Sequence, residues 1–398
     1  MQTDHIILFD GIERNHLLPL SATRAIADFR IGILTIREKW EKYFGLVSDV
    51  LTLPYLQTKY SYHQKDNSVF INATVLPDKR LIAEIEKLHQ NAVLKDKDTV
   101  IAFKTDTPIN TLEDLWLLDN LAIYTVNHDI QIRNTWDVFL LNGQEIINDI
   151  ALLNLQPNSE SLSKTNSLLG RENIYVEEGV QCEYAVLNAS KGPIFLGKES
   201  EVMEGTTIRG AFSLGKHATL KMQSKIYGDT SIGPYCKVGG EVSNSVLFAF
   251  SNKAHDGFLG NAVIGEWCNL GADTNNSNLK NNYGNVSAWN YAAKDYINSG
   301  LQFLGLIMGD HSKSGINTMF NTGTVAGVGA NIFGGGVPSK FIPDFSWGGA
   351  EGFQDFKLEK MFEVAERVME RRGVDFSVQD KAILTHIFEA TKELRLEK

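Results

Sequence analysis

Aliphatic residues recur every six positions through the middle of the chain. From residue 196 the sequence divides into the units LGKESE, VMEGTT, IRGAFS, LGKHAT, LKMQSK, IYGDTS, IGPYCK and VGGEVS, each of which begins with Leu, Ile or Val. A helix requires apolar spacings of three and four, and a half-buried strand requires a spacing of two. One aliphatic residue in every six therefore predicts short strands joined by tight turns, which wind around a prism with the aliphatic side chains inside.

The six-residue phase continues on both sides of this block. Later units begin at Ile264, Leu270, Met308, Ser314 and Ala326, and each of these residues precedes a glycine. Weaker earlier units begin at Ile174, Val180 and Val186. Small residues at the corners of such a prism relieve crowding between successive turns. We expect the solenoid to span residues 168–350.

The first 155 residues carry a different pattern. The run HIILFDG (5–11) is apolar up to Asp-Gly, as expected of a buried strand that enters a functional loop. Apolar residues between positions 26 and 43 follow helical spacing, and Gly45 can close that helix. Because strand-like segments alternate with helical ones, an α/β domain is predicted over residues 1–155, followed by a polar linker at 155–167.

The last segment, residues 351–398, is predicted to form two amphipathic helices. Leu358, Phe362, Ala365 and Met369 have helical spacing, and Ser377 begins a capping-box sequence. We expect these helices to pack against a neighbouring element or subunit.

Composition narrows the functional classes. The chain has 398 residues and a formal net charge of −10, which argues against nucleic acid as a partner but leaves room for a single bound nucleotide. Its three cysteines lack the spacing of a zinc site or a disulfide framework. The amino terminus does not read as a signal peptide, and no apolar run approaches the ~20 residues of a membrane span. A cytoplasmic protein with no membrane partner is expected.

Three motifs in the second half of the chain carry a family resemblance. They are SNKAH (251–255), GADT (271–274) and the pair Asn282-Tyr283. With an α/β domain before a hexapeptide solenoid, the chain resembles the GlmU-like bifunctional sugar nucleotidyltransferases/acetyltransferases, in particular a shorter branch found in Bacteroidetes-type bacteria. The resemblance implies a left-handed parallel β-helix, acetyl-CoA as co-substrate and a homotrimer with coenzyme A in the clefts between subunits.

The resemblance assigns roles to residues of the solenoid. His255 corresponds to the histidine that deprotonates the sugar amine, and an imidazole with an ordinary pKa near ~6.5 suits that role. Asn282 and Tyr283 would line the acceptor and acyl pocket, together with Ala272 and Thr274. Thr318, in SGINT, corresponds to a family segment that meets acetyl-CoA. The competing interpretation of His255 is a hydrogen-bonded turn histidine.

The nucleotide site is predicted from the stretch that follows the first strand. The family's glycine-rich loop is reduced here to Gly11, while Arg14 and Arg24 would replace its basic residues at the nucleotide phosphates. Asp10 is the acidic candidate for Mg²⁺, because Asn72 stands where a carboxylate is expected. The family's basic residues for the sugar phosphate are also missing, with Lys225, Lys237 and Lys253 as candidate substitutes or ordinary solvated charges.

The expected function is therefore a transferase of UDP-N-acetylglucosamine synthesis. It would acetylate glucosamine-1-phosphate from acetyl-CoA and couple the sugar 1-phosphate to UTP with Mg²⁺. One alternative is a nucleotidyltransferase of another base or sugar specificity, such as a thymidylyltransferase, whose solenoid serves assembly. A second is a non-catalytic solenoid scaffold or sugar-nucleotide sensor.

Overall fold

The computed structural model describes residues 3–117 and 121–396. Its contacts divide the chain into two compact units. The N-terminal unit comprises Met1–Leu17, Thr23–Phe29 and Leu34–Asn134, and the solenoid unit comprises Leu18–Ala22, Arg30–Ile33 and Thr135–Lys398. The chain thus passes between the two units several times before residue 135.

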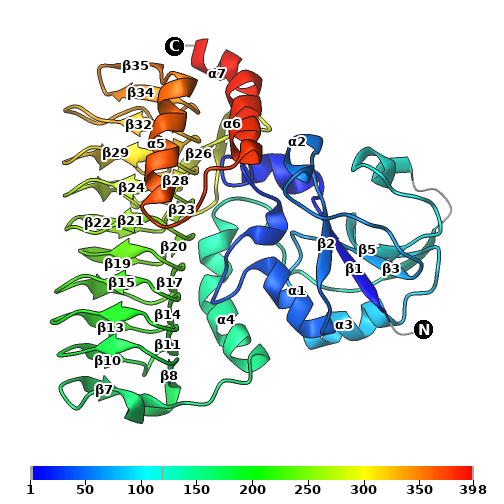
Figure 1. Ribbon diagram of the computed structural model, residues 1–398, viewed down its shortest axis with the longest axis horizontal. Coiled ribbons are helices and arrows are strands. Elements are labelled where there is room, and N and C mark those ends of the chain that lie inside the picture. Colours follow the sequence, from blue (N-terminus) through cyan, green and yellow to red (C-terminus); the bar gives the residue numbers. More distant parts are fainter. Residues whose placement is uncertain (1–2, 118–120, 397–398) are drawn as a thin grey trace. The chain divides into compact units, whose positions relative to one another are not determined.

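The N-terminal unit is built on a six-stranded sheet of order β2-β1-β3-β5-β4-β6. Its strands are β1 (His5–Phe9), β2 (Ser48–Leu51), β3 (Ser68–Asn72), β4 (Ala92–Asp96), β5 (Thr99–Lys104) and β6 (Ala122–Thr125). Strand β1 runs parallel to both neighbours, whereas β5 is antiparallel to β3 and β4. All five residues of β1 are buried, as the run HIILF predicts. Helices α1 (Ile36–Phe44), α2 (Pro54–Gln57) and α3 (Lys79–Glu86) complete this unit (Figure 1).

Helix α1 begins at Ile36, so the prediction that a helix starts near residue 26 is wrong. Gly32 has a left-handed backbone (φ +78°), and the N–H groups of Gly32 and Ile33 donate to the side chains of Asn142 and Asp149, each at 2.8 Å. These tertiary bonds are incompatible with a continuous helix through residue 32. A capping box at Thr35 then starts α1, and Gly45 ends it with φ +68°, as predicted.

The solenoid unit contains three sheets of short strands, stacked in parallel as rungs (Figure 1). The first solenoid sheet holds β7 (Ser167–Leu169), β10 (Val186–Asn188), β13 (Thr207–Arg209), β16 (Lys225–Ile226), β19 (Glu241–Ser243) and β22 (Phe258–Gly260). The second holds β8 (Ile174–Val176), β11 (Ile194–Leu196), β14 (Phe212–Leu214), β17 (Thr230–Ile232), β20 (Val246–Leu247), β23 (Val263–Ile264), β28 (Ile307–Met308), β31 (Val325–Ala326) and β33 (Phe341–Ile342). The third holds β9 (Gln181–Cys182), β12 (Glu201–Val202), β15 (Thr219–Leu220), β18 (Lys237–Val238), β21 (Asn252–Lys253), β24 (Asn269–Leu270), β29 (Lys313–Ser314), β32 (Asn331–Ile332), β34 (Ser346–Gly349) and β35 (Gly352–Asp355). This arrangement is typical of a left-handed parallel β-helix.

The six-residue period corresponds to the core of this β-helix, as predicted. The eight residues that open the units are at most 2% exposed: Leu196, Val202, Ile208, Leu214, Leu220, Ile226, Ile232 and Val238. The glycines that follow several of them are required because successive coils approach closely. A Cβ on Gly197, for example, would lie 2.7 Å from the carbonyl oxygen of Leu214.

The stretch that interrupts the period leaves the solenoid as a hairpin. Its strands β26 (Ser287–Asn290) and β27 (Asp295–Asn298) pair antiparallel, while β25 (Asn275–Asn276) pairs with β30 (Met319–Phe320) in the solenoid itself.

One corner of the β-helix carries a ladder of rings: His217, Tyr235, Phe250, Trp267 and His311. Successive ring centroids are 4.8, 4.9, 4.1 and 6.3 Å apart. All five residues have φ between 55 and 61°, a strained region for side-chain-bearing residues. Stacking along the corner offsets that strain, since each aromatic pair contributes about 0.5–1.5 kcal/mol beyond its burial.

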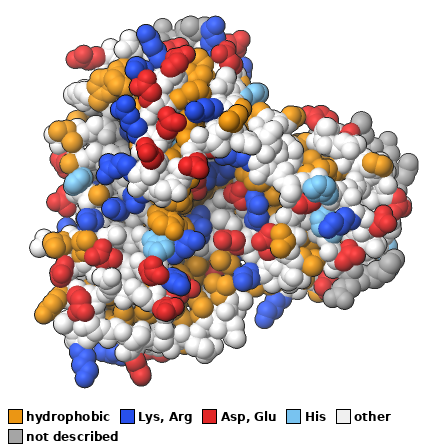
Figure 2. All heavy atoms as spheres, viewed as in Figure 1, with side chains coloured by type: hydrophobic (Ala, Val, Ile, Leu, Met, Phe, Trp, Pro, Cys, Tyr) orange, Lys and Arg blue, Asp and Glu red, His pale blue; other side chains and the backbone are white. Residues whose placement is uncertain are grey.

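Four helices complete the solenoid unit. Helix α4 (Asp137–Leu152) packs against β14, β17 and β20 of the second solenoid sheet (Figure 1). The N-terminal unit thus lacks this helix and the segments Leu18–Ala22 and Arg30–Ile33, all of which the predicted α/β domain of residues 1–155 included. Helices α5 (Leu358–Glu370), α6 (Val378–Ala390) and α7 (Lys392–Leu396) follow the last strands, and Ser377 forms the predicted capping box of α6. Figure 2 shows acidic and basic side chains interspersed over this face of the solenoid.

Candidate functional site

A cavity of about 460 Å³ opens in the N-terminal unit where β1 and β3 end. Its lining includes Gly11 and Glu13 after β1, Asn72 at the end of β3, and Lys95 and Thr99 from β4 and β5. Because the chain places β2 on one side of β1 and β3 on the other, the sheet order reverses beside β1. Ligands of open α/β sheets bind at this kind of reversal, outside the carboxyl ends of the strands.

Gly11, Glu13 and Asn72 form the part of the cavity wall beside the ends of β1 and β3, while Lys95, Asp98 and Thr99 add further polar groups. A Cβ on Gly11 would lie 2.3 Å from Glu13 Oε2 and 3.0 Å from Asn72 Nδ2, so a larger residue would displace the carboxylate from its place beside the strand end. Glu13 Oε1 accepts a hydrogen bond from Gln131 Nε2 at 3.0 Å, whereas Oε2 is buried with no hydrogen-bond partner among residues 3–117 and 121–396. The cavity therefore holds a carboxylate oxygen that is available to a ligand.

Asn72 is held in place by its own neighbours. Its Nδ2 donates to the carbonyl of Val100 at 3.1 Å, and its Oδ1 accepts from the N–H and the hydroxyl of Thr74 at 3.0 and 2.8 Å. The amide thus connects the end of β3 to the start of β5, at the position where the sequence resemblance predicts a carboxylate.

Asp10 and Arg14 form an internal ion pair, with Arg14 Nη1 2.6 Å from Asp10 Oδ2. Asp10 also accepts from the N–H of Ile26 at 2.8 Å and the hydroxyl of Thr52 at 2.5 Å. Burial alone would lower the pKa of Arg14, but the Asp10 carboxylate raises it and keeps the guanidinium charged. Neither side chain lines the cavity, so Asp10 has little capacity left for a metal and Arg14 for a phosphate.

Arg24 is 7% exposed, and its carbonyl accepts a hydrogen bond from Arg14 Nη1 at 3.1 Å. Of the predicted nucleotide-binding residues, Gly11 alone lines the cavity. The sequence interpretation missed Glu13, Lys95 and Thr99. For Glu13 a signal existed, because it lies two residues after the glycine that follows the first strand; Lys95 and Thr99 reach the cavity only through the pairing of β4 and β5.

His255 lies at an exposed corner of the β-helix between β21 and β22. Its imidazole has no hydrogen-bond partner within the described part of the chain. The N–H of Asp273 donates to the carbonyl of Asp256 at 3.0 Å, and the N–H of Asn317 donates to the carbonyl of Ala272 at 2.8 Å. The corners that carry His255, Ala272 and Asn317 are therefore stacked on successive coils.

The other predicted acyltransfer residues divide into two groups. Thr274 and Thr318 are at most 3% exposed. The Thr274 hydroxyl bonds Ser314 Oγ, and the Thr318 hydroxyl donates to the carbonyl of Gly315, both at 2.9 Å. Asn282 and Tyr283 are exposed in the turn before the hairpin, where Asn282 Oδ1 accepts from the N–H of Gly284. No hydrogen bond joins either of them to His255 in the described ranges.

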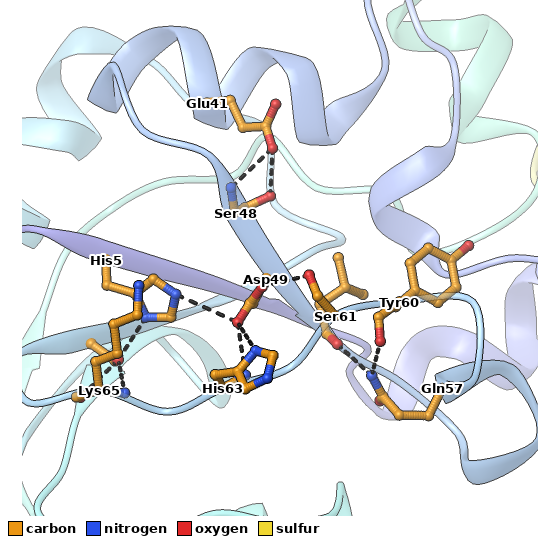
Figure 3. A network of polar contacts seen from close by, with 11 residues as sticks. His5, Glu41, Ser48, Asp49, Gln57, Tyr60, Ser61, His63 and Lys65 are labelled. Atoms are coloured by element: carbon orange, nitrogen blue, oxygen red, sulfur yellow. Dashed lines mark hydrogen bonds and ion pairs between the residues drawn. The ribbon is translucent and has the colours of Figure 1, made fainter.

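A second polar cluster lies at the opposite end of β1 (Figure 3). His5 Nδ1 is 2.8 Å from Ser68 Oγ, and His5 Nε2 is 3.6 Å from Asp49 Oδ2, an order of groups found in serine hydrolases. Ser68 is, however, 3% exposed, and its hydroxyl both donates to the carbonyl and accepts from the N–H of Lys65. The cluster joins strands and offers no accessible nucleophile.

This cluster makes the N-terminal unit sensitive to acid. Burial alone would raise the pKa of Asp49, but the Ser61 hydroxyl, the His63 N–H and the charges of His5 and His63 together hold it below its ordinary value of 3.8. Because the folded pKa is lowered, the stabilisation is present at neutral pH and is lost as pH falls below about 4. Asp49→Asn should therefore lower the melting temperature at pH 7, and the difference from wild type should shrink below pH 4 in thermal melts. The exposed Asp66→Asn is the matched control; a constant difference at all pH values would contradict the prediction.

Metal ligands do not form a ready-made cluster in the described residues. No group of three or more His, Cys, Asp or Glu side chains there is arranged to hold a metal ion. Mg²⁺, however, is commonly held by one or two carboxylates together with substrate phosphates. Within the same residues, no helix combines the length and the apolar character needed to cross a membrane.

Residues 6–157 match the family described as sugar nucleotidyl transferase. The matched segment contains β1, β3 and the cavity between their carboxyl ends. No curated protein sequence matches the chain. The fold is thus a nucleotidyltransferase-like α/β domain followed by a hexapeptide β-helix, and the protein is a transferase.

Three solved structures are similar to parts of the chain. An Arabidopsis UDP-N-acetylglucosamine acyltransferase shares 14% identity over 58% of this chain and 90% of its own, with a TM-score of 0.22. The N-acyltransferase AntD from Bacillus cereus shares 11% over 52% and 91%, with a TM-score of 0.21. The acetyltransferase domain of PglB from Neisseria gonorrhoeae, solved with acetyl coenzyme A, shares 10% over 88% and 99%, with a TM-score of 0.17.

Proposed function

We propose that the protein transfers a nucleotidyl group to a sugar 1-phosphate in its N-terminal unit and an acyl group to an amino sugar on its solenoid. The observation that carries the first activity is the cavity at the carboxyl ends of β1 and β3, inside the segment that matches sugar nucleotidyl transferases. The second activity rests on the solenoid's hexapeptide repeat and on the exposed imidazole of His255.

The specific reactions we propose belong to UDP-N-acetylglucosamine synthesis. Glucosamine-1-phosphate would be acetylated from acetyl-CoA, and N-acetylglucosamine-1-phosphate would attack the α-phosphate of UTP with release of pyrophosphate. Support for this choice comes from the SNKAH, GADT and Asn-Tyr motifs. A homotrimeric, cytoplasmic enzyme would accord with the same resemblance.

In the nucleotidyl site, Glu13 and Lys95 would act on the triphosphate. Lys95 lines the cavity and can place positive charge near phosphate oxygens. The buried, unpartnered Oε2 of Glu13 fits Mg²⁺ better than Asp10 does, because the oxygens of Asp10 already accept three hydrogen bonds. Bound Mg²⁺ would neutralise charge on the phosphates.

In the acyl site, His255 would take the proton from the sugar amine as the nitrogen attacks the thioester carbonyl. The thiolate of coenzyme A then leaves, and an amide forms. An exposed imidazole without an internal partner is free to accept that proton.

The nucleotidyl activity can be tested by pyrophosphate release. Wild-type protein is incubated with Mg²⁺, UTP or dTTP, and N-acetylglucosamine-1-phosphate or glucose-1-phosphate; release is expected with UTP and N-acetylglucosamine-1-phosphate. Release with dTTP alone would favour the thymidylyltransferase alternative. Nucleotide-sugar binding without turnover would favour the sensor alternative. The absence of both binding and turnover would overturn the proposal.

Glu13→Gln should weaken Mg²⁺-dependent UTP binding. The amide keeps the shape of the side chain and removes the charge beside Gly11, so the Kd for UTP with Mg²⁺ should rise roughly 10-fold or more. The measurement is the shift in melting temperature caused by UTP with and without Mg²⁺, which does not depend on turnover. The exposed Glu86→Gln is the control, and an unchanged Mg²⁺-dependent shift in Glu13→Gln would remove Glu13 from the site.

A further inference from the structure

Lys253 occupies a position that the hexapeptide pattern reserves for an aliphatic residue. It lies opposite Val238 in the third solenoid sheet, and it is 1% exposed. The inward residue of the following strand in that sheet is Leu270, also buried. A lysine here puts an ammonium group inside the β-helix, which costs free energy unless that group is bonded.

The Lys253 ammonium donates to two carbonyl groups of the next corner. Its Nζ is 2.5 Å from the carbonyl oxygen of His255 and 3.2 Å from that of Asp256. Both acceptors belong to exposed residues, whereas the ammonium itself is inside. The side chain thus reaches from the core to the backbone of the turn that carries His255.

Equivalent corners on other coils are closed without a lysine. In several of them the residue four positions after the inward one is Ser or Thr, and its N–H bonds back to the corner: Ser224 to the carbonyl of Lys221 at 3.2 Å and Thr274 to that of Gly271 at 3.1 Å. The Ser224 hydroxyl adds a second bond to Lys221, and the Thr318 hydroxyl bonds Gly315 in the same way. These corners therefore carry their own caps.

The His255 corner lacks this cap. The fourth residue after Lys253 is Gly257, which has no hydroxyl. Its φ is +115°, whereas in the other corners the left-handed residue is the third one, namely Gln223, Asp273 or Asn317, with φ of 56–60°. A Cβ on Gly257 would lie 2.2 Å from the carbonyl of Thr274, so the glycine allows the turn to pack on the next coil. In this corner the Lys253 ammonium supplies hydrogen bonds of another kind, to the second and third carbonyl groups after the inward position instead of the first.

We infer that Lys253 is the positioning residue for His255, because its ammonium fixes the two carbonyl groups of the turn that presents the imidazole. This inference rests on the acyl transfer proposed for His255. Lys253 itself is too deeply buried to meet a substrate, so its effect must pass through the shape of the turn.

Stability and activity should respond in opposite ways to the loss of this ammonium. Burial lowers the pKa of Lys253 to about 8, although Asp256 and Asp273 act in the other direction. A lysine pKa below its ordinary value means that the charged form destabilises the fold at pH 7, a cost relieved as pH rises from 8 towards 10.5. A purely structural residue would lower stability when removed; Lys253→Met should leave the melting temperature at pH 7 unchanged or raised.

The test compares Lys253→Met with Lys313→Met. Lys313 lies in the same sheet, donates to the carbonyl of His311 at 2.9 Å and also has a pKa lowered to about 8, but it does not touch the His255 corner. In Lys253→Met we expect faster hydrogen exchange in residues 251–260 and a kcat for thiol release from acetyl-CoA about 10- to 100-fold lower, with KM changed less than about twofold. Lys313→Met should change none of these.

Unchanged exchange and unchanged kcat in Lys253→Met would overturn the inference, as would an equal loss in Lys313→Met. If wild type releases no thiol, the proposed acyl transfer fails, while the exchange measurement still decides whether Lys253 holds the turn. Lys253→Gln, which stays polar but is too short to reach both carbonyls, should show the same changes and replaces the Met variant if that variant does not fold.

Discussion

His255→Ala should lower thiol release from acetyl-CoA and glucosamine-1-phosphate by about 10²- to 10⁴-fold, the usual contribution of a general base. The reason is chemical: an ammonium group cannot attack a thioester until it loses a proton, and the exposed imidazole is the base that the corner presents. Pyrophosphate release in the N-terminal unit should be unchanged, because its cavity contains no solenoid residue. The measurement is initial-rate thiol release at pH 7 to 8.

The control is His217→Ala, which removes an exposed histidine from a different corner of the same β-helix. Activity should survive that change even if stability falls through loss of ring stacking. Equal rates for His255→Ala and wild type would mean that His255 is a turn histidine, which was the competing interpretation of the sequence.

Asn142→Leu should destabilise the solenoid unit by about 3–5 kcal/mol. Asn142 is fully buried on α4; its Oδ1 accepts from the N–H of Gly32 and the hydroxyl of Ser231, and its Nδ2 donates to the carbonyl of Asp229, all at 2.8 Å. Leucine would leave the buried N–H of Gly32, the buried hydroxyl of Ser231 and the part-buried carbonyl of Asp229 without this partner, each at a cost of about 1–3 kcal/mol. Urea unfolding followed by circular dichroism measures the change.

Gln144→Leu is the matched control, since it makes the same kind of substitution at an exposed position of the same helix. Its effect should stay within about 0.5 kcal/mol. A loss below about 1 kcal/mol in Asn142→Leu would show that water or a rearranged segment 30–33 satisfies the three groups.

At the nucleotide site, residue type and position after the first strand did not determine which side chains line the cavity. Asp10 and Arg14 have the residue types that metal and phosphate require, and they follow the first strand as a nucleotide loop does. In the fold they satisfy each other, because the spacing of four residues brings carboxylate and guanidinium within 2.6 Å in a buried environment. Glu13 precedes Arg14 in a short 3-10 helix (Ile12–Leu17) and lines the cavity instead.

For Lys253, too, the sequence alone did not predict the environment of the side chain inside the solenoid. From the sequence it is one more basic residue, to be counted as solvated or phosphate-binding. Only the stacking of coils reveals that its position faces inward, and only the conformation of the neighbouring corner explains why an ammonium group is needed there.

The sequence by itself determined the class of fold. A six-residue aliphatic period can be satisfied only by coils in which each six-residue side turns one side chain inward. An apolar run before Asp-Gly can be satisfied by a buried strand inside a sheet. These are local regularities, repeated or strong enough to read without knowing any distant contact. The tertiary structure alone decided which polar groups are free, because hydrogen bonds to Ile26, Val100 and Ser314, all distant in sequence, occupy Asp10, Asn72 and Thr274, and Arg14 is paired with Asp10. Within the described residues, no hydrogen bond reaches Oε2 of Glu13 or the imidazole of His255. These two groups therefore remain available for chemistry.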